Sequence, residues 1–227
     1  MRRVDRAVDR ATAGSRPGNK RGQRSRGEIL DVAARIMAER GYAATSLSVL
    51  STETGLPKSA IYHHFHSKGG LLTAVMERGL NDFFSAMREA HRDPPEGGTH
   101  LERLSWFLQR TSEVLGARTD FMRLHMILVL SAEAAEAEIA GTIETVRRDG
   151  RVLMNDMIRE SFLDEGAAIA QAVADELDYF GIAGFDGAFL AMQADPARSL
   201  APQNKLLAQA IVLLGEQIVA RLKSGAA

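Results

Sequence analysis

Apolar residues recur at helical spacing along almost the whole chain from residue 28 onward. Ile29, Ala33 and Ile36 lie three or four positions apart, which is the period of one helix face. Gly41 follows, and a glycine readily adopts the left-handed conformation in which helices commonly end. The pattern therefore predicts a first helix that ends at Gly41.

Two short helices are predicted next. Thr45 and Ser46 can cap a helix over residues 47–54, and Pro57 separates it from a third helix over residues 58–65. Two short helices joined by a glycine turn have the spacing of a helix-turn-helix, in which the second helix can lie in the major groove of DNA.

The third helix has one apolar and one polar side. Ile61 and Phe65 are four positions apart and predict the side that packs against the first two helices. Lys58, Ser59 and His63 fall on the opposite side, so we expect them to project outward.

The remaining chain predicts further helices and an all-α fold: an N-terminal three-helix DNA-binding head followed by a helical bundle. Pro94-Pro95 and Gly97-Gly98 make the clearest break in the pattern. Helices are expected over residues 67–92, 99–116, 120–134, 137–166, 167–193 and 204–222. The apolar stripe of the last helix is wider than one buried face requires, which indicates a second buried face.

Composition and charge narrow the functional class. The chain has 227 residues, 45% of them hydrophobic, and no cysteine. It has no uninterrupted apolar stretch long enough for a membrane span, so we expect no membrane partner and a cytoplasmic location. Residues 1–27 hold nine Lys and Arg but two Asp, whereas the other 200 residues hold 19 Lys and Arg and 27 Asp and Glu. This basic end is either a solubilising tail or an arm that binds nucleic acid.

Candidate chemistry other than binding is sparse. His63 and His66 are three residues apart, but no Asp, Glu or Cys lies within residues 56–68 to complete a zinc site. Phosphate-binding glycine loops, a nucleophile elbow and the paired Glu-x-x-His of di-iron bundles are absent from the sequence. We therefore expect no catalytic residue, no metal site, no cofactor and no enzymatic activity.

The segment GYAATSLSVLSTETGLPKSAIYHHFHSKGGLL resembles the DNA-binding segment of the tetracycline-repressor (TetR/AcrR) family. The resemblance covers roughly residues 25–75 and consists of elements ordered at fixed spacing. They are the glycine after the first helix, Thr-Ser at the second, the turn glycine, aromatic-x-His-Phe, and Ser-Lys before a leucine. It divides the chain into a basic arm (1–23), a helix-turn-helix domain (24–70) and a ligand-binding and dimerisation domain (71–227).

The resemblance implies which residues meet DNA. Phosphate contacts are implied for Thr45, Ser46, Tyr62 and Lys68, and contacts to phosphates or base edges for Lys58, Ser59, Ala60, His63 and His64. Arg24 and Arg26 beside the first helix are expected to add phosphate or minor-groove contacts. The role of His66 stays open.

Two positions depart from the family pattern. Pro57 stands where a capping Ser or Thr is usual, and Gly69-Gly70 where an acidic pair is usual. We expect the third helix to lack a side-chain cap and the glycine pair to make the junction with the fourth helix compliant.

The resemblance also implies an effector pocket and a homodimer interface. The pocket is expected to take a largely apolar small molecule, and its candidate residues are Trp106, Phe107, Arg110, Phe121, Met122, His125, Met126, Met154, Met157, Phe180 and Phe189. The dimer interface is expected on the last two helices, with candidates Gly181, Gly184, Ala188, Leu207, Ile211, Leu214 and Ile218. The alternative for the glycines is a bend or loop, and the alternative for the aromatic and Met residues is plain core.

These expectations combine into a ligand-responsive transcriptional regulator. It would bind a near-palindromic DNA operator as a homodimer, most simply as a repressor released by the small molecule. The alternative is an all-helical binding protein or enzyme that retains the helix-turn-helix as a scaffold without operator binding.

Overall fold

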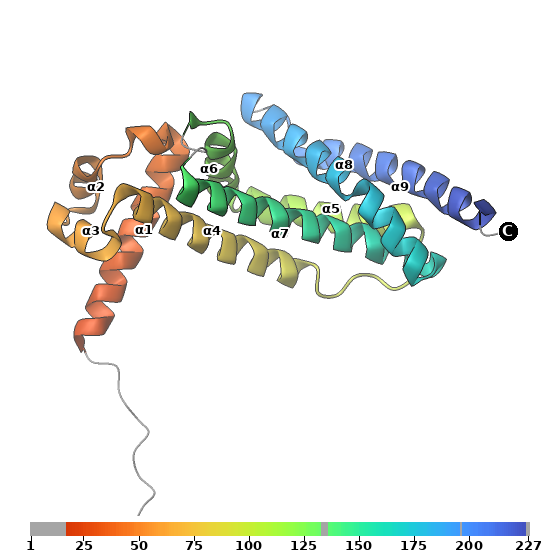
Figure 1. Ribbon diagram of the computed structural model, residues 1–227, viewed down its shortest axis with the longest axis horizontal. Coiled ribbons are helices and arrows are strands. Elements are labelled where there is room, and N and C mark those ends of the chain that lie inside the picture. Colours follow the sequence, from red (N-terminus) through yellow and green to blue (C-terminus); the bar gives the residue numbers. More distant parts are fainter. Residues whose placement is uncertain (1–16, 133–135, 196, 226–227) are drawn as a thin grey trace, which may run out of the picture.

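The computed structural model describes residues 17–132, 136–195 and 197–225, and all regular structure in these residues is helical. Figure 1 shows a small head of three helices at one end of a longer helical bundle. The helices are α1 (Pro17–Ala44), α2 (Leu47–Thr54), α3 (Lys58–Phe65), α4 (Lys68–Ala90), α5 (His100–Gly116), α6 (Thr119–Val129), α7 (Ala137–Ser161), the 3-10 turn η2 (Leu163–Glu165), α8 (Ala167–Ala194) and α9 (Leu200–Gly225).

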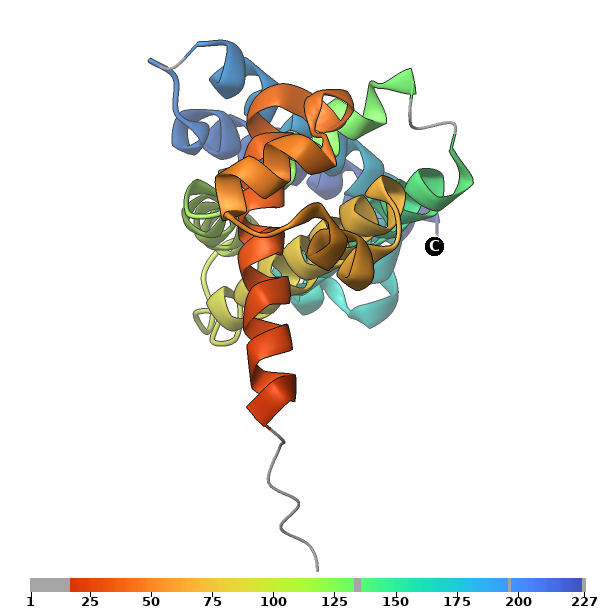
Figure 2. The same cartoon turned by 90° about the vertical axis from the view of Figure 1, so that its left-hand side faces the viewer.

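The head is built by α1, α2 and α3, as the sequence predicted. Gly41 interrupts α1 with φ 80° and ψ 162°, so the expected end of the first helix is a kink followed by one more turn. Both short helices have the predicted bounds. Figure 2, which views the molecule from the head, shows α2 and α3 lying across α1.

The first helix begins earlier than expected. It starts at Pro17, a residue whose fixed φ favours the first position of a helix. Residues 17–23, which were assigned to the basic arm, therefore belong to α1. The rest of the predicted arm, residues 1–16, lies outside the described residues.

Two hydrophobic clusters form the core, and α4 contributes to both. Leu71 and Met76 at its N-terminal end pack with the head residues Ile36, Leu50, Ile61 and Phe65. Phe84 and Met87, three to four turns further along, pack in the bundle cluster with residues of α5, α7, α8 and α9. A single rigid helix thus runs from the head into the bundle (Figure 1).

Helix α6 also faces both clusters. Leu124 and Leu128 pack in the head cluster, while Met122 and Met126 pack in the bundle cluster. This short helix therefore fills the junction between head and bundle. Among the described residues, no helix combines the length and apolarity required to span a bilayer.

Candidate nucleic-acid interface and ligand cavity

The outward face of α3 is fixed by what the helix buries. Ile61 is fully buried and Phe65 nearly so, which orients the helix toward α1 and α2. The helix begins directly after Pro57, whose side chain makes no capping hydrogen bond, in agreement with the expected missing cap. The Pro57 carbonyl instead accepts hydrogen bonds from the Ala60 and Ile61 amides, at 2.9 and 3.4 Å.

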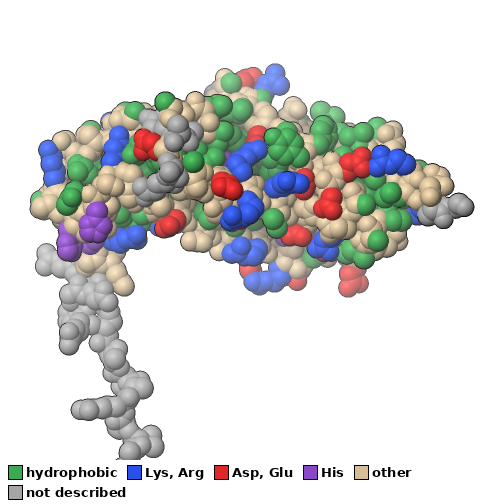
Figure 3. Space-filling model, in the orientation of Figure 1, with side chains coloured by type: hydrophobic (Ala, Val, Ile, Leu, Met, Phe, Trp, Pro, Cys, Tyr) green, Lys and Arg blue, Asp and Glu red, His purple; other side chains and the backbone are tan. Residues whose placement is uncertain are grey.

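The opposite face of α3 carries the residues expected at DNA. Lys58, Ser59, Tyr62 and His63 are exposed, and Tyr62 exposes 58% of its surface. Ala60 and His64 are half-buried beside them. Histidine side chains gather on the surface of the head in Figure 3. The face thus combines a cation with several hydrogen-bonding groups, which suits contact with phosphates and base edges.

Thr45 and Ser46 have different roles at the start of α2. The Ser46 hydroxyl is exposed and caps the helix by accepting a hydrogen bond from the Val49 amide, at 3.2 Å. Thr45 is fully buried, and its hydroxyl donates to the Gly41 carbonyl at 3.1 Å. In contrast to the expectation, the Thr45 side chain is therefore not available to a phosphate, because it stabilises the kink at the end of α1.

The basic residues around the head are held by neighbours. The Lys68 ammonium donates to the Ala43 carbonyl at 3.0 Å and lies 4.3 Å from the centre of the Tyr42 ring. Arg26 is exposed and lies over the ring of Phe65, at 5.2 Å. Arg24 is exposed and pairs with Glu28 at 3.0 Å. These contacts hold three cations of the head in place, two on α1 and one at the start of α4.

His66 ends α3. Its φ of 60° lies in the left-handed region, and its amide donates to the Tyr62 carbonyl at 2.8 Å. The imidazole is exposed and meets the Tyr62 ring edge-on, with ring centres 6.4 Å apart. The role left open from the sequence is therefore, in part, that of a helix cap.

Gly70 lies in close contact with the end of α3. A Cβ at this position would lie 2.5 Å from the Phe65 carbonyl oxygen, which is backbone and cannot move aside. The Gly70 amide also donates to the Ser67 hydroxyl that caps α4, at 2.8 Å. This glycine therefore permits a close contact between the end of α3 and the first turn of α4, while the expected compliance of the junction stays a prediction.

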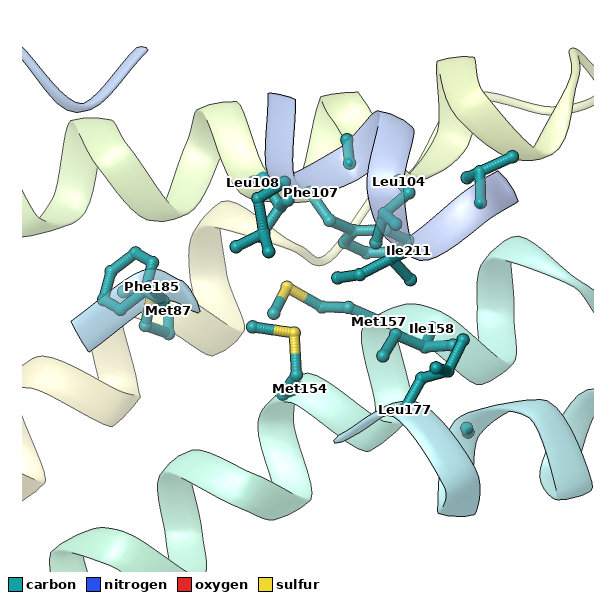
Figure 4. Close-up of a cluster of buried hydrophobic side chains, with 14 of the residues drawn as sticks. Met87, Leu104, Phe107, Leu108, Met154, Met157, Ile158, Leu177, Phe185 and Ile211 are labelled. Atoms are coloured by element: carbon teal, nitrogen blue, oxygen red, sulfur yellow. The ribbon is translucent and has the colours of Figure 1, made fainter. Parts of the chain in front are cut away.

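A cavity opens in the bundle between α4, α5, α6, α7 and α8. Its empty space is about 540 Å³ when the open mouth is included. Figure 4 shows Met154, Met157, Met87 and Phe185 around the same region of the core. The residues that line the cavity are Phe83, Phe84, Met87, Thr111, Met122, His125, Val146, Arg147, Gly150, Leu153, Met154, Met157, Ile182, Phe185 and Asp186.

His125 is the buried polar group of this cavity. It exposes 1% of its surface, and neither ring nitrogen has a hydrogen-bond partner among the described residues. Burial, with a smaller contribution from the nearby Arg147 cation, lowers the pKa of His125 to about 4. The imidazole is therefore neutral at physiological pH, with one donor and one acceptor nitrogen.

Arg147 and Asp186 form an ion pair across the cavity wall, from α7 to α8. Both are partly exposed, which places the pair toward the mouth. Burial raises the pKa of Asp186, although the hydrogen bond and charge of Arg147 oppose that shift. The other polar lining residue, Thr111, donates its hydroxyl to the Phe107 carbonyl at 3.0 Å.

The cavity contains some of the residues expected from the sequence. Met122, His125, Met154 and Met157 line it. The other candidates lie elsewhere: Phe107, Met126 and Phe189 are core residues, Trp106 and Phe121 pack at its edge, Arg110 is exposed and pairs with Glu113, and Phe180 is exposed. Phe107, Met126 and Phe189 each lie four residues from a lining residue, on the same side of the helix but one turn further along it, so helical spacing cannot separate them from the lining.

Sequence reasoning missed most of the lining. Phe83, Phe84 and Met87 on α4 belong to the same apolar stripe that connects this helix to the head, so they had no separate signal. Arg147 pairs with Asp186, which is 39 positions away in the sequence and on another helix, so no short-range spacing indicated this contact. The available signal in the sequence was a basic residue, Arg147, on one long helix and an acidic residue, Asp186, on the next.

Most residues expected at the dimer interface pack inside one protomer, whereas Leu214 is exposed. A Cβ on Gly181 would lie 2.7 Å from the Met154 sulfur, and one on Gly184 would lie 2.5 Å from a Leu207 methyl. These glycines thus permit close packing of α8 on α7 and α9 of the same chain. Leu207, Ile211 and Ile218 are buried, Ala188 packs against the core, and Leu214 is 36% exposed.

Other apolar residues of α8 and α9 face outward. The two helices lie side by side along one edge of the bundle (Figure 1). Their large exposed apolar side chains are Tyr179, Phe180, Leu190, Leu206, Leu213 and Leu214. The second buried face predicted for the last helix thus corresponds to a face that is exposed in the single chain.

In the described part of the chain, no group of three or more His, Asp or Glu side chains is placed to hold a metal ion.

Residues 29–75 match the profile of the family described as "Bacterial regulatory proteins, tetR family". The chain is 35% identical over 89 residues to the HTH-type transcriptional activator FasR of Mycolicibacterium smegmatis, a match that covers 37% of this chain and 41% of FasR. It is 37% identical over 85 residues to the HTH-type transcriptional repressor KstR2 of Rhodococcus jostii, which covers 37% of this chain and 41% of KstR2. The matches thus span about two fifths of each relative.

The whole fold is also similar to solved structures. A putative transcriptional regulator from Saccharomonospora viridis, crystallised in complex with choline, superimposes with a TM-score of 0.66. The superposition covers 82% of this chain and 94% of that one, at 19% identity. At that identity the similarity establishes the fold of the bundle, while the head also matches in sequence. Residues 29–75 therefore match the tetR family of bacterial regulatory proteins in sequence, and the chain as a whole resembles solved transcriptional regulators in fold.

Proposed function

We propose that this protein is a transcriptional repressor that binds operator DNA as a homodimer and releases it when a small, largely apolar molecule enters the bundle cavity. The proposal rests on one observation: the same chain has an exposed polar face on α3 and a cavity in the bundle, and α6 connects the two. Helix α6 forms part of the cavity wall and also packs against the head. Operator binding would place its action in the cytoplasm, and regulation rather than enzymatic turnover would be its activity.

The DNA contacts are proposed for the exposed face of α3 and the residues around it. Lys58, Ser59 and His63 would approach base edges or phosphates, with Ala60 and His64 beside them. Ser46, Tyr62 and Lys68 would contact phosphates, and Arg24 and Arg26 would add charge at the side of α1. Thr45 is left out because its hydroxyl is buried.

The homodimer is proposed to form through the exposed apolar residues of α8 and α9. Leu206 and Leu213 are seven residues apart on α9, so they lie on one side of the helix, and each exposes more than half of its surface. Phe180 and Leu190 on α8 extend this face. A two-fold axis through it would place two α3 helices about one DNA turn, ~34 Å, apart on a near-palindromic site.

The proposed coupling runs through α6. Its Met122 and His125 line the cavity, and its Leu124 and Leu128 pack in the head cluster. A ligand that changes the position of α6 would therefore change the support beneath α1. Such coupling typically amounts to about 1–3 kcal/mol, or roughly a 5- to 150-fold change in operator affinity.

Selection from random DNA duplexes tests the proposed function. The purified full chain would be used to enrich duplexes, which are then sequenced. A near-palindromic consensus with half-sites about one turn apart supports an operator-binding dimer. Enrichment without a consensus would contradict it, and would favour the alternative in which the head is only a scaffold.

A further inference from the structure

We infer that the ligand of the cavity is a neutral amphipathic molecule with a hydroxyl group, an alcohol or a phenol, whose oxygen pairs with a ring nitrogen of His125. This inference rests on the proposed function, because it names the chemical class of the effector. It is carried by the one polar side chain of the lining that has no hydrogen-bond partner among the described residues.

The charges of the cavity balance without a ligand. The Arg147 guanidinium and the Asp186 carboxylate pair with each other, and the His125 imidazole is neutral. A charged ligand group buried here would have to displace one partner of that pair and leave the other uncompensated, which is costly in a site of low polarity. A ligand without net charge avoids this cost.

A hydroxyl group matches His125 in either tautomer. A neutral imidazole presents a donor on one ring nitrogen and an acceptor on the other. A ketone or an ether only accepts, so it pairs with the protonated nitrogen alone, whereas a hydroxyl can donate or accept. It therefore satisfies whichever nitrogen faces the ligand, and it removes the cost of an unpartnered buried polar atom.

The rest of the lining favours an apolar body. Phenylalanine and methionine side chains dominate it, and methionine adapts to irregular or ring-shaped surfaces. Thr111 adds little further polarity, because its hydroxyl already donates to the Phe107 carbonyl. One polar head on an apolar body thus describes the complement of this cavity.

Calorimetric titration with four matched probes tests the inference on the full chain without DNA. The probes share one butylphenyl body: para-butylphenol, its methyl ether para-butylanisole, para-butylbenzoate and para-butylbenzylamine. At neutral pH the first two are uncharged, the third is an anion and the fourth is a cation. We expect para-butylphenol to bind about tenfold more tightly than each of the other three.

Two substitutions and a control locate the effect. His125→Phe keeps a ring but removes both nitrogens, so the advantage of the phenol over its ether should vanish. His125→Gln retains a donor and an acceptor and should keep part of that advantage. Phe84→Leu changes the lining without changing its polarity and should weaken the phenol and the ether equally. Thermal unfolding of each variant verifies that it folds.

Tightest binding of the benzoate or the amine, equal binding of all four probes, or no binding of the phenol would overturn the inference. An unchanged preference for the phenol in His125→Phe would do the same. These outcomes are separate from the DNA selection. Phenol binding through His125 without any change in operator affinity would uphold the ligand class and contradict the proposed ligand response.

Discussion

The backbone of His66 adopts a conformation that its side chain disfavours. His66 has φ 60° and ψ −36°. All other described residues with positive φ are glycines. Such a conformation costs on the order of 1–3 kcal/mol for a residue with a Cβ. The position closes α3 and directs the chain into Ser67 and α4, so the geometry of the turn requires it.

Replacing His66 with glycine should therefore stabilise the protein by about 1 kcal/mol, because glycine adopts positive φ without strain. Urea denaturation of the variant and the wild type measures the difference. His63→Gly is the matched control, since His63 lies within α3 and glycine there should cost about 0.5–1 kcal/mol. Equal effects of the two substitutions would show that backbone strain at His66 is not the cause.

His125 predicts a pH dependence of stability. Its pKa is lowered from the ordinary 6.5 to about 4, so between these values the unfolded chain binds a proton that the folded chain does not. The contribution of His125 is complete above pH 6.5 and is lost as the pH falls toward 4, by about 3 kcal/mol in all.

The His125→Phe variant lacks this contribution, so its unfolding free energy should decrease less between pH 6.5 and 4 than that of the wild type. Denaturation series across this range measure both curves. The other titrating groups are present in both proteins and cancel in the difference. Parallel curves would mean that the buried imidazole becomes protonated without penalty.

At the scale of elements, the junction of α3 and α4 depends on the absence of one Cβ. Gly70→Ala would place that atom 2.5 Å from the Phe65 carbonyl oxygen and force the two helices apart. We expect a loss of about 1–3 kcal/mol in stability and weaker operator binding, because α4 supports the position of α3. Urea denaturation and DNA titration measure the two effects.

Gly141→Ala is the control for this substitution. Gly141 also lies in a helix, but a Cβ there would meet no atom within 4 Å. Alanine at this position should stabilise α7 by up to about 1 kcal/mol. A Gly70→Ala variant that behaves like Gly141→Ala would contradict the tight junction and support a compliant one.

At the scale of the whole molecule, the exposed apolar face of α8 and α9 predicts the oligomeric state. Leu213→Asp would place a charge in the centre of that face, and burying it in an interface without a partner is costly. We expect the variant to be monomeric in sedimentation experiments and to lose cooperative binding to a two-half-site operator.

Val152→Asp is the control for the interface. Val152 is also a large exposed apolar residue, at 56%, but it lies on α7 rather than on α8 or α9. This variant should remain a dimer. If both variants sediment as the wild type does, the dimer uses another surface.

The sequence by itself determined the helices and the head. Their signals are local: a three-to-four-residue period of apolar positions, a capping Ser46, a glycine turn and Pro57, so each could be read without knowing the neighbours in space. The buried face of α3, and with it the exposed face opposite, followed from the spacing of Ile61 and Phe65 alone.

The tertiary structure decided which of several equivalent faces meet. Helical spacing made Phe107, Met126 and Phe189 as plausible for the cavity as Met122 and Met154, because each belongs to an apolar stripe. Helical spacing likewise could not separate the buried residues of α9 from the exposed ones. Leu207 and Ile211 pack inside the protomer, whereas Leu206 and Leu213 lie on an adjacent side of the same helix and are exposed. A helix with two apolar faces does not encode which one is covered by its own chain, since that depends on the radial orientation imposed by all its neighbours together.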